Sequence, residues 1–348
     1  DFGTSCTKVV VGDRALGKAY AIPIIETSGL GSYLLPSRVW ESNGNYSLHQ
    51  EGKSHRDLKL RLLGQQYADE DFEHAAAFLG LVIRQVRGWI LSQPQYAKTG
   101  IVWQLNLGLP AASYADKELE SRFKALAVAA EAIADRPMQL PSTEEVRAIC
   151  RIVRKSSLEN AIDHFSVDTE VDVVPEISAQ VYGFVKSEHF DPKATNIFMV
   201  IDVGAGTVDS SIFHVRKESR GEHGFFYYSN LVDKNGVVNL HRSRVDWLRQ
   251  AFNAHNINSE TESSLDGMSA FSDLLGAFPE SVRDYFEGVS LCFNDSKSNP
   301  DWRFFWERCW DQVFSKTIAS IRDRKLSQAQ LSRELPLFLC GGGSRMEF

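Results

Sequence analysis

The sequence predicts a mixed α/β fold of about two domains, and three observations lead to the class, the globular character and the size. Short runs of β-branched and aromatic residues, bounded by turn-forming residues, alternate with longer segments whose apolar residues recur at helical spacing. The hydrophobic fraction of 43% and the charged fraction of 24% are typical of a packed globular protein. At roughly 150 residues per domain, a chain of 348 residues allows about two domains.

The predicted strands are short, rich in β-branched or aromatic residues, and flanked by glycine or other turn formers. In chain order they cover residues 7–11, 20–25, 101–109, 197–203, 211–215, 225–228 and 335–340. The run at 197–203 is a strong strand that leads directly into a glycine turn.

The predicted helices lie between these strands. Residues 69–93 carry one apolar stripe, and residues 113–135 begin with a good N-cap residue. Ser142 and Glu145 have the spacing of a capping box, which predicts that a third helix begins there. Residues 302–324 carry a tryptophan-rich stripe. This stripe could face a partner, but we interpret it as a core-facing surface.

The charge balance is acidic, with 38 Lys and Arg residues against 45 Asp and Glu residues and a net charge of -7. A chain with this balance is not expected to bind nucleic acid non-specifically. No uninterrupted apolar run reaches the roughly 18 residues that span a bilayer, and the start of the chain does not resemble a secretory signal. We therefore expect neither a membrane nor a direct nucleic-acid partner.

The five cysteines are widely spaced and contain no CxxC pair. This pattern argues against a disulfide framework or a cysteine zinc site, and it favours reduced thiols in the cytoplasm. The nine histidines likewise show no paired metal spacing. The sequence opens at Asp1 without a methionine and stops at Phe348 soon after three glycines, so we expect it to be part of a longer protein.

A short motif occurs twice in the chain. Residues 1–11 are DFGTSCTKVVV, and residues 202–212 are DVGAGTVDSSI. Each copy has an aspartate, an apolar residue, a glycine, a turn of small residues and then a predicted strand. Two unrelated β-turns are the alternative, because Asp-x-Gly is common. Two related copies at this separation predict two lobes, each offering one hairpin turn to a shared cleft.

Hairpin turns of this kind can bind an anion through their backbone amides, and glycine is needed where the backbone approaches the ligand closely. Thr4, Ser5 and Thr207 add hydroxyl donors. Asp1 and Asp202 would repel each other across a cleft. A hydrated magnesium ion between them removes the repulsion and neutralises phosphate charge. The two turns therefore predict a polyphosphate site.

A third motif lies near the end of the chain, where residues 337–345 are LFLCGGGSR. An apolar strand runs into a glycine turn on which a flat ring can lie, and Arg345 is placed to stack on that ring.

In this order, the three motifs resemble the two phosphate motifs and the adenosine motif of the actin, heat-shock-70 and sugar-kinase ATPase superfamily. The resemblance covers nearly the whole chain and is nearest the nucleotide-binding domain of heat-shock-70 (DnaK-like) chaperones. Residues 108–111 and 174–179 resemble that family's turn before a helix and its first connecting segment. The resemblance implies a two-lobed actin-like ATPase fold, with duplicated ribonuclease-H-like lobes and inserted subdomains around a nucleotide cleft. Lobe I would cover residues 1–183 and lobe II residues 184–348.

The resemblance also implies roles for individual residues. Asp1, Asp202 and Asp209 would hold magnesium through its waters. The remaining binding residues would hold the phosphates through backbone amides or the adenosine through the last turn. The residues expected to hold the phosphates are Gly3, Thr4, Ser5, Gly204, Ala205, Gly206 and Thr207. The residues expected to hold the adenosine are Gly341, Gly342 and Arg345.

Lys59 is the candidate for placing the attacking water, and Asp1, Asp202 and Glu176 complete the expected catalytic set. The implied chemistry is in-line attack of water on the γ-phosphate, helped by positioning and charge neutralisation. Lys59 lies one residue out of the family register, and a surface lysine is its alternative interpretation.

Other departures concern the acids of the family. Val174 stands where chaperones have an acid before proline, and Glu176 lies two residues further on. Glu280 and Arg283 are only a weak counterpart of the helix that holds adenosine in chaperones. We therefore expect slow or absent hydrolysis while binding is kept.

The resemblance implies an ATPase with ATP or ADP and Mg²⁺ as cofactors, in which nucleotide biases an equilibrium between open and closed lobes. Protein partners, which would be clients, co-chaperones or complex subunits, would respond to this equilibrium. Two alternatives stay open. One is an actin-like filament or assembly ATPase, which would be a homo-oligomer. The other is a nucleotide-sensing subunit of a larger complex with weak catalysis.

Overall fold

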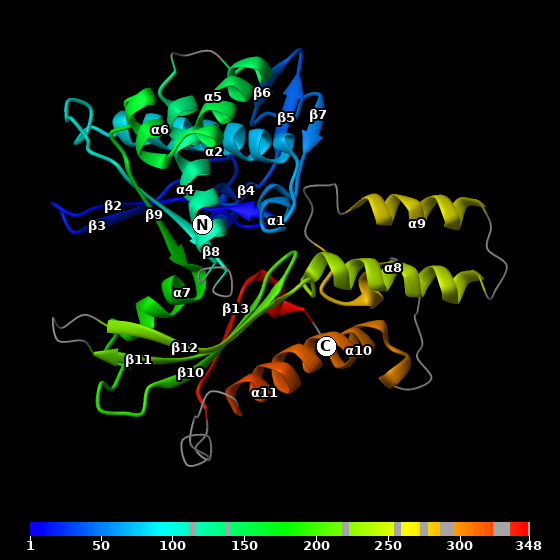
Figure 1. Cartoon of the computed structure of the whole chain (residues 1–348). Helices are drawn as coiled ribbons and strands as arrows, with labels where there is room; N and C mark the ends of the chain where they lie inside the picture. Colours follow the sequence, from blue (N-terminus) through cyan, green and yellow to red (C-terminus); the bar gives the residue numbers. More distant parts are fainter. Residues whose placement is uncertain are drawn as a thin grey trace. The chain divides into compact units, whose positions relative to one another are not determined.

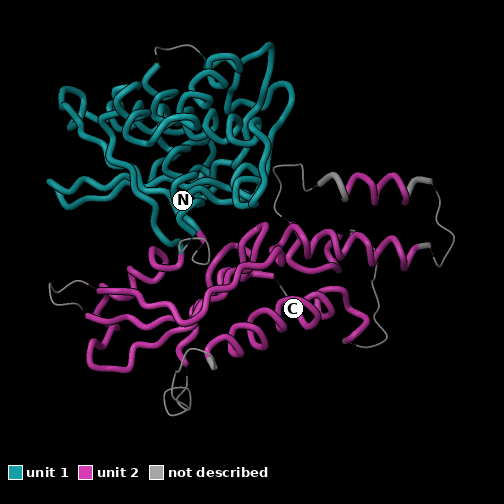
Figure 2. The backbone as a smooth tube through the Cα atoms, viewed as in Figure 1, with its two compact units in different colours: residues 1–109, 113–176 teal, residues 110–112, 177–348 magenta. Residues whose placement is uncertain are grey.

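The computed structural model describes most of the chain. The described residues are 1–110, 116–136, 140–217, 223–253, 259–271, 278–285, 296–322 and 335–346. Within them the protein is a mixed α/β structure with several small sheets, which confirms the predicted class (Figure 1). The chain forms two compact units, residues 1–109 with 113–176 (unit 1) and residues 110–112 with 177–348 (unit 2) (Figure 2). The predicted lobe boundary at residue 183 falls inside helix α7 (Glu176–Val185).

The strands of unit 1 form small, separate sheets. The antiparallel pairs are β1 (Cys6–Thr7) with β4 (Leu35–Pro36) and β2 (Val10–Asp13) with β3 (Lys18–Ala21). In a third, antiparallel sheet, β5 (Val39–Ser42) lies between β6 (Asn45–Ser47) and β7 (Lys53–His55). The fourth is the parallel pair β8 (Gln104–Leu109) and β9 (Glu170–Pro175).

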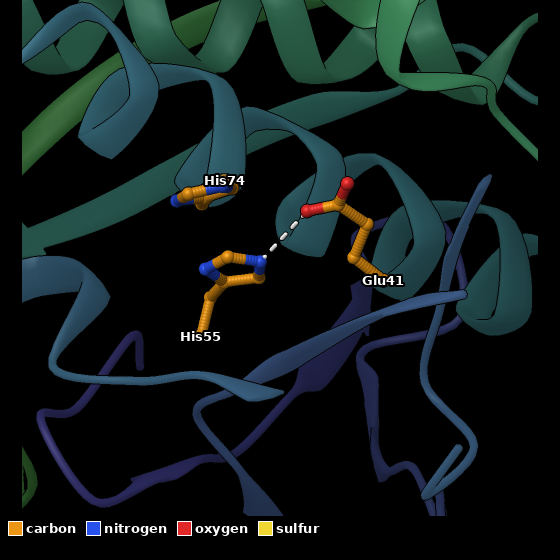
Figure 3. Close-up of side chains that lie close together, drawn as sticks. All are labelled: Glu41, His55 and His74. Atoms are coloured by element: carbon orange, nitrogen blue, oxygen red, sulfur yellow. Dashed lines mark hydrogen bonds and ion pairs between the residues drawn. The ribbon is translucent and has the colours of Figure 1, made fainter. Parts of the chain in front are cut away.

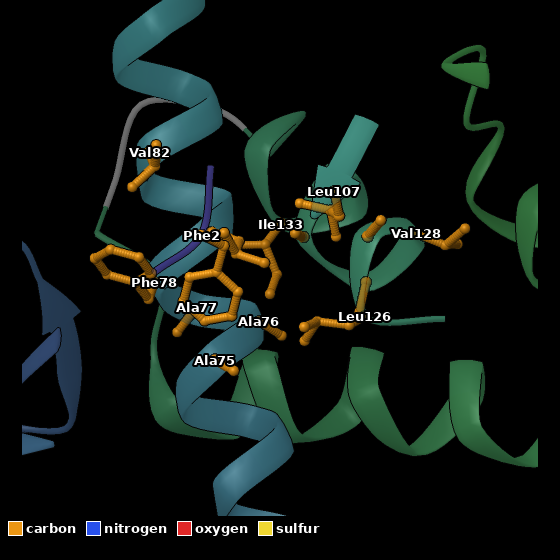
Figure 4. Packing of buried hydrophobic residues seen from close by; sticks show 14 of the residues in the cluster. Phe2, Ala75, Ala76, Ala77, Phe78, Val82, Leu107, Leu126, Val128 and Ile133 are labelled. Atoms are coloured by element: carbon orange, nitrogen blue, oxygen red, sulfur yellow. The ribbon is translucent and has the colours of Figure 1, made fainter. Parts of the chain in front are cut away.

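The helices of unit 1 surround its hydrophobic core. They are η1 (Gly29–Tyr33), α1 (Leu58–Leu62), α2 (Asp69–Ser92), α4 (Lys117–Ala134), α5 (Thr143–Lys155) and α6 (Leu158–Phe165). Helices α2 and α4 pack closely because Gly80 leaves room for Ile133, whose side chain a Cβ at residue 80 would meet at 2.7 Å. Phe2, Phe78 and Leu107 lie in the same core (Figure 4). By length and composition α2 could cross a membrane, but its apolar residues form this core.

Local sequence explains where these helices begin. Ser142 Oγ accepts a hydrogen bond from the amide of Glu145 at 3.2 Å, which confirms the predicted start of α5. Asp116 Oδ1 accepts from the amides of Glu118 and Leu119 at the start of α4. Ser113, the expected N-cap, lies outside the described residues.

Unit 2 is built on one four-stranded sheet with the order β12-β11-β10-β13. Its strands are β10 (Ile197–Val203), β11 (Val208–Lys217), β12 (His223–Asp233) and β13 (Leu337–Cys340). Strand β11 is antiparallel to both β10 and β12, and β13 is parallel to β10. The predicted strand at 197–203 is confirmed at both ends.

Apolar residues cover both faces of β10, because successive side chains of a strand point to opposite sides. Phe198 and Val200 share a core cluster with α7. Ile197, Met199 and Ile201 share another with the helical segment from 300 to 322. The described helices of unit 2 are α7, α8 (Val237–Asn253), α9 (Ser259–Phe271), η2 (Val282–Tyr285), η3 (Ser296–Ser298), α10 (Pro300–Phe304), η4 (Phe305–Lys316, a π-helix), α11 (Thr317–Arg322) and η5 (Gly342–Arg345).

The tryptophan-rich stripe of this segment differs in part from its prediction. Val313 and Ile321 are buried, but Trp306 is 40% exposed. Its ring lies against the rings of Trp302 and Trp310, with centroids 5.6 and 4.6 Å away. The stripe is therefore only partly a core surface, because its tryptophans pack on one another and on Phe305 and Phe314.

Candidate functional site

The residues predicted to bind nucleotide fall into one group in each unit. Unit 1 holds Asp1, Gly3, Thr4, Ser5, Lys59 and Glu176. Unit 2 holds Asp202, Gly204, Ala205, Gly206, Thr207, Asp209, Gly341, Gly342 and Arg345.

The first Asp-x-Gly motif forms a tight hairpin. The amide of Lys8 donates to the carbonyl of Asp1 at 2.9 Å, and Phe2 and Thr7 form a bridge between the two arms. A Cβ at Gly3 would lie 2.5 Å from the carbonyl oxygen of Cys6, so the turn needs glycine at this position. Buried Phe2 holds the hairpin against the core, with its ring 5.8 Å from that of Phe78 (Figure 4).

Ser37 fixes the tip of this hairpin from outside. Its hydroxyl donates to the carbonyl of Gly3 at 2.6 Å, and its amide donates to the carbonyl of Ser5 at 2.8 Å. In the part of the chain that the structure describes, the backbone amides of Thr4 and Ser5 donate to no protein acceptor. The tip therefore has engaged carbonyls and available amides, which suits an anion.

Asp1 and Ser5 are the exposed members of this group. The carboxylate of Asp1 is 47% exposed and pairs with the ammonium of Lys8 at 2.8 Å. Asp1, Lys59 and Glu176 all lie in unit 1, although they are distant in sequence.

Lys59 and Glu176 form a buried ion pair. Lys59 lies in α1 and is only 3% exposed, so it is not a surface lysine, and its Nζ donates to Glu176 Oε1. Glu176 follows β9 directly and is the first residue of α7. Gly108 leaves space for this carboxylate, because a Cβ at residue 108 would lie 2.7 Å from Glu176 Cγ. A buried ammonium needs such a partner, since its desolvation is costly.

The second Asp-x-Gly motif forms a hairpin of the same kind between β10 and β11. The amide of Gly204 donates to the carbonyl of Thr207 at 2.9 Å. A Cβ at Gly204 would lie 3.1 Å from that carbonyl oxygen, which is the equivalent of the contact between Gly3 and Cys6. Among the described residues, the amides of Ala205 and Gly206 donate to no protein acceptor.

The first turn of α8 fixes this second hairpin. The carbonyls of Ala205 and Gly206 accept from the amides of Val238 at 2.8 Å and Gly236 at 3.3 Å. A Cβ at Gly236 would lie 2.5 Å from the carbonyl oxygen of Ala205. Sequence reasoning missed Gly236. Its signal was a single glycine directly before a helix.

Asp202 is held from two sides. The amide of Gln180 donates to its Oδ2, and Gly341 packs against its Oδ1, where a Cβ would collide. Gly341 has a φ of +83°, a conformation that favours glycine. Asp202 pairs in register with Cys340 on β13, so the second and third motifs lie side by side in unit 2. Sequence reasoning also missed Gln180, which carries no motif.

Asp209 lies directly opposite Asp202 across the β10–β11 pair and is buried. Cross-strand partners share one face of a sheet, and like charges placed this way repel each other. A cation near these carboxylates would remove the repulsion, and their hard oxygen ligands fit magnesium.

Arg345 lies at the end of the adenosine motif, and its guanidinium donates to Glu280 at 3.0 Å. Both side chains are well exposed, so the pair contributes little to stability. The structure thus places Glu280, the weak counterpart of the adenosine-holding acid, next to the predicted adenosine residue.

No protein-family model matches the chain, and no curated protein matches it.

Proposed function

We propose that the protein binds ATP with magnesium and hydrolyses it slowly, as a two-lobed actin-like ATPase related to heat-shock-70 nucleotide-binding domains. The observation that carries the proposal is the buried pair of Lys59 and Glu176. These residues come from distant parts of the sequence, were assigned to hydrolysis by the same resemblance, and contact each other in unit 1.

The two hairpins support nucleotide binding. Each has a glycine where a side chain would meet a backbone carbonyl, and each has turn amides that donate to no acceptor in the described part of the chain. Such amides stabilise phosphate oxygens without a cation. In this proposal unit 1 and unit 2 are the two lobes, and each offers one hairpin whose amides can bind phosphate oxygens.

Magnesium fits the carboxylates of this set. Asp202 and Asp209 would hold it through water molecules in unit 2, and Asp1 is the acid that the resemblance assigns to it in unit 1. When bound, the ion would neutralise phosphate charge.

Lys59 would orient the attacking water. An ammonium has three donors, and Glu176 engages one of them. Glu176 thereby fixes the direction of the side chain, while the other donors can bind a water molecule or a phosphate oxygen. Positioning of this kind lowers the barrier without covalent chemistry.

One observation favours a second candidate, a nucleotide-sensing subunit with weak catalysis. Lys8 already neutralises the carboxylate of Asp1, so Asp1 would be a weaker ligand for the ion. In this case Lys8→Ala would raise the rate of phosphate release, whereas an unchanged rate would remove the candidate.

Calorimetric titration with Mg-ATP tests the proposal. We expect wild-type protein to bind, and Asp202→Asn to bind at least about tenfold more weakly, because one acid of the magnesium site loses its charge. Asp246→Asn is the matched control, since Asp246 lies exposed on α8. An absence of binding by wild-type protein, or equal affinities for wild type and Asp202→Asn, would contradict the proposal.

A further inference from the structure

Three side chains that the nucleotide proposal does not use come together in unit 1. Glu41 lies on β5, His55 on β7 and His74 on α2 (Figure 3). One potential ligand atom from each residue lies within 4.8 Å of the other two. Two imidazoles and a carboxylate on separate elements are a ligand set that sequence spacing alone does not reveal.

Strand register explains why Glu41 and His55 meet. His55 pairs with Val39 across β5 and β7, and Glu41 is two residues beyond Val39 on the same face. His55 Nε2 lies 2.9 Å from Glu41 Oε2. Diagonal neighbours on one sheet face are within reach of such long side chains.

Helix α2 supplies the third group. The rings of His55 and His74 are stacked, with centroids 3.6 Å apart and planes 22° apart. Tyr46 on β6 contacts the ring of His74 edge-on, with the two ring centroids 5.8 Å apart. Two strands and a helix therefore hold all three groups close to one another.

Both imidazoles are suited to bind a metal at neutral pH. Burial, followed by the nearby His55, lowers the pKa of His74 to about 4. Burial also lowers the pKa of His55, although Glu41 opposes this shift. Neutral imidazoles keep a free lone pair, so no proton has to leave when a metal binds.

We propose that Glu41, His55 and His74 bind one zinc ion, or a divalent ion of similar ligand preference, with solvent as the fourth ligand. Two histidines and a glutamate with an open position are an established zinc ligand set. The ion would tie the sheet of β5, β6 and β7 to α2, independently of nucleotide. Lys53 and Arg61 are close enough to lower the pKa of His55, and their charges would moderate the affinity.

Zinc titration of the metal-free full chain by calorimetry tests this site. We expect one ion per chain and at least tenfold weaker binding for His74→Phe, which keeps an aromatic ring but loses the ligand. The control is His164→Phe, because His164 lies exposed on α6 outside the cluster. Cobalt as a probe should give the intense visible absorption of a tetrahedral site in wild-type protein but not in His74→Phe. Magnesium should not compete, since it prefers oxygen ligands.

Circular dichroism of each variant shows whether it folds. If His74→Phe does not fold, Glu41→Gln decides, because it keeps the shape of the side chain and removes the charged ligand. An absence of saturable zinc binding by wild-type protein would overturn the proposal. The same conclusion would follow if His164→Phe lost as much affinity as the cluster variant that folds.

Discussion

The same Asp-x-Gly hairpin lies in different surroundings in the two units. In unit 1, Asp1 is exposed, pairs with Lys8 and precedes a strand of only two residues. In unit 2, Asp202 is near the end of a seven-residue buried strand, and both Gln180 and Gly341 contact its carboxylate. The turn itself depends on local sequence, whereas the position of the carboxylate depends on its neighbours.

The buried ion pairs of the two units differ in a related way. In unit 2, Arg244 binds Asp301 through two hydrogen bonds of 2.6 and 2.8 Å, and also donates to the carbonyls of Pro279 and Glu280. In unit 1, Lys59 donates to Glu176 alone among the described residues. A buried ion pair whose cation donates to several acceptors, as Arg244 does, is typical of a structural role. Lys59 keeps donors for another molecule.

The largest expected effect is a loss of unfolding free energy when the pair of Arg244 and Asp301 is broken. Asp301→Ala leaves the guanidinium of Arg244 buried without its carboxylate, and should cost unit 2 about 3–5 kcal/mol. Chemical denaturation with hydrogen exchange of the α8 amides measures the loss. Asp246→Ala, at an exposed ion pair of α8, should cost less than about 0.5 kcal/mol. A similar small loss for Asp301→Ala would remove the structural interpretation.

The next effect concerns catalysis. Lys59→Met should lower the rate of phosphate release by about a hundredfold, or about 2.7 kcal/mol, because the water loses its positioning group. The affinity for ATP should stay within about threefold, since binding relies on the hairpins. Single-turnover measurements give the rate, and Lys124→Met, on a partly exposed pair of α4, is the control. An unchanged rate would show that the buried lysine has only a structural role.

A smaller effect compares neighbouring glycines of the third motif. Gly341→Ala should destabilise unit 2 by about 2 kcal/mol, because residue 341 has a positive φ and its Cβ would collide with Asp202. Gly342→Ala should be nearly neutral, since no atom lies within 4 Å of its Cβ position. Thermal unfolding of the two variants measures the difference. Equal melting temperatures would contradict the close contact with Asp202.

The smallest effect compares the two hairpins directly. Gly3→Ala should destabilise its unit by about 1 kcal/mol more than Gly204→Ala, because the added Cβ would lie 2.5 Å from a carbonyl oxygen in the first case and 3.1 Å in the second. Denaturation followed separately for each unit by hydrogen exchange gives both values. A larger destabilisation by Gly204→Ala than by Gly3→Ala would mean that the backbone of the first hairpin shifts more easily to accommodate the added Cβ.

Several elements could be predicted because their signals are local. The strand at 197–203 is continuous and apolar. Ser142 caps α5 through a hydrogen bond with Glu145, which is only three residues away in sequence. Strands β5, β6 and β7 were missed because they are short and partly polar. Val39 of β5 and Tyr46 of β6 pack in the core of unit 1, and such tertiary packing leaves no signal in a local stretch of sequence.

The candidate sites show the same limit. Resemblance named Lys59 and Glu176 separately, but only the fold brings them into contact and buries the lysine. Histidine spacing gave no metal signal, although His55 and His74 stack on each other.

By itself, the sequence determined the α/β class, the hairpin turns and the starts of α2 and α5, since these depend on backbone sterics and on neighbours a few residues away. Tertiary structure decided which carboxylate holds Lys59, what surrounds Asp202 and which histidines meet. These contacts depend on strand register and helix packing, and burial of apolar surface over a whole unit selects both.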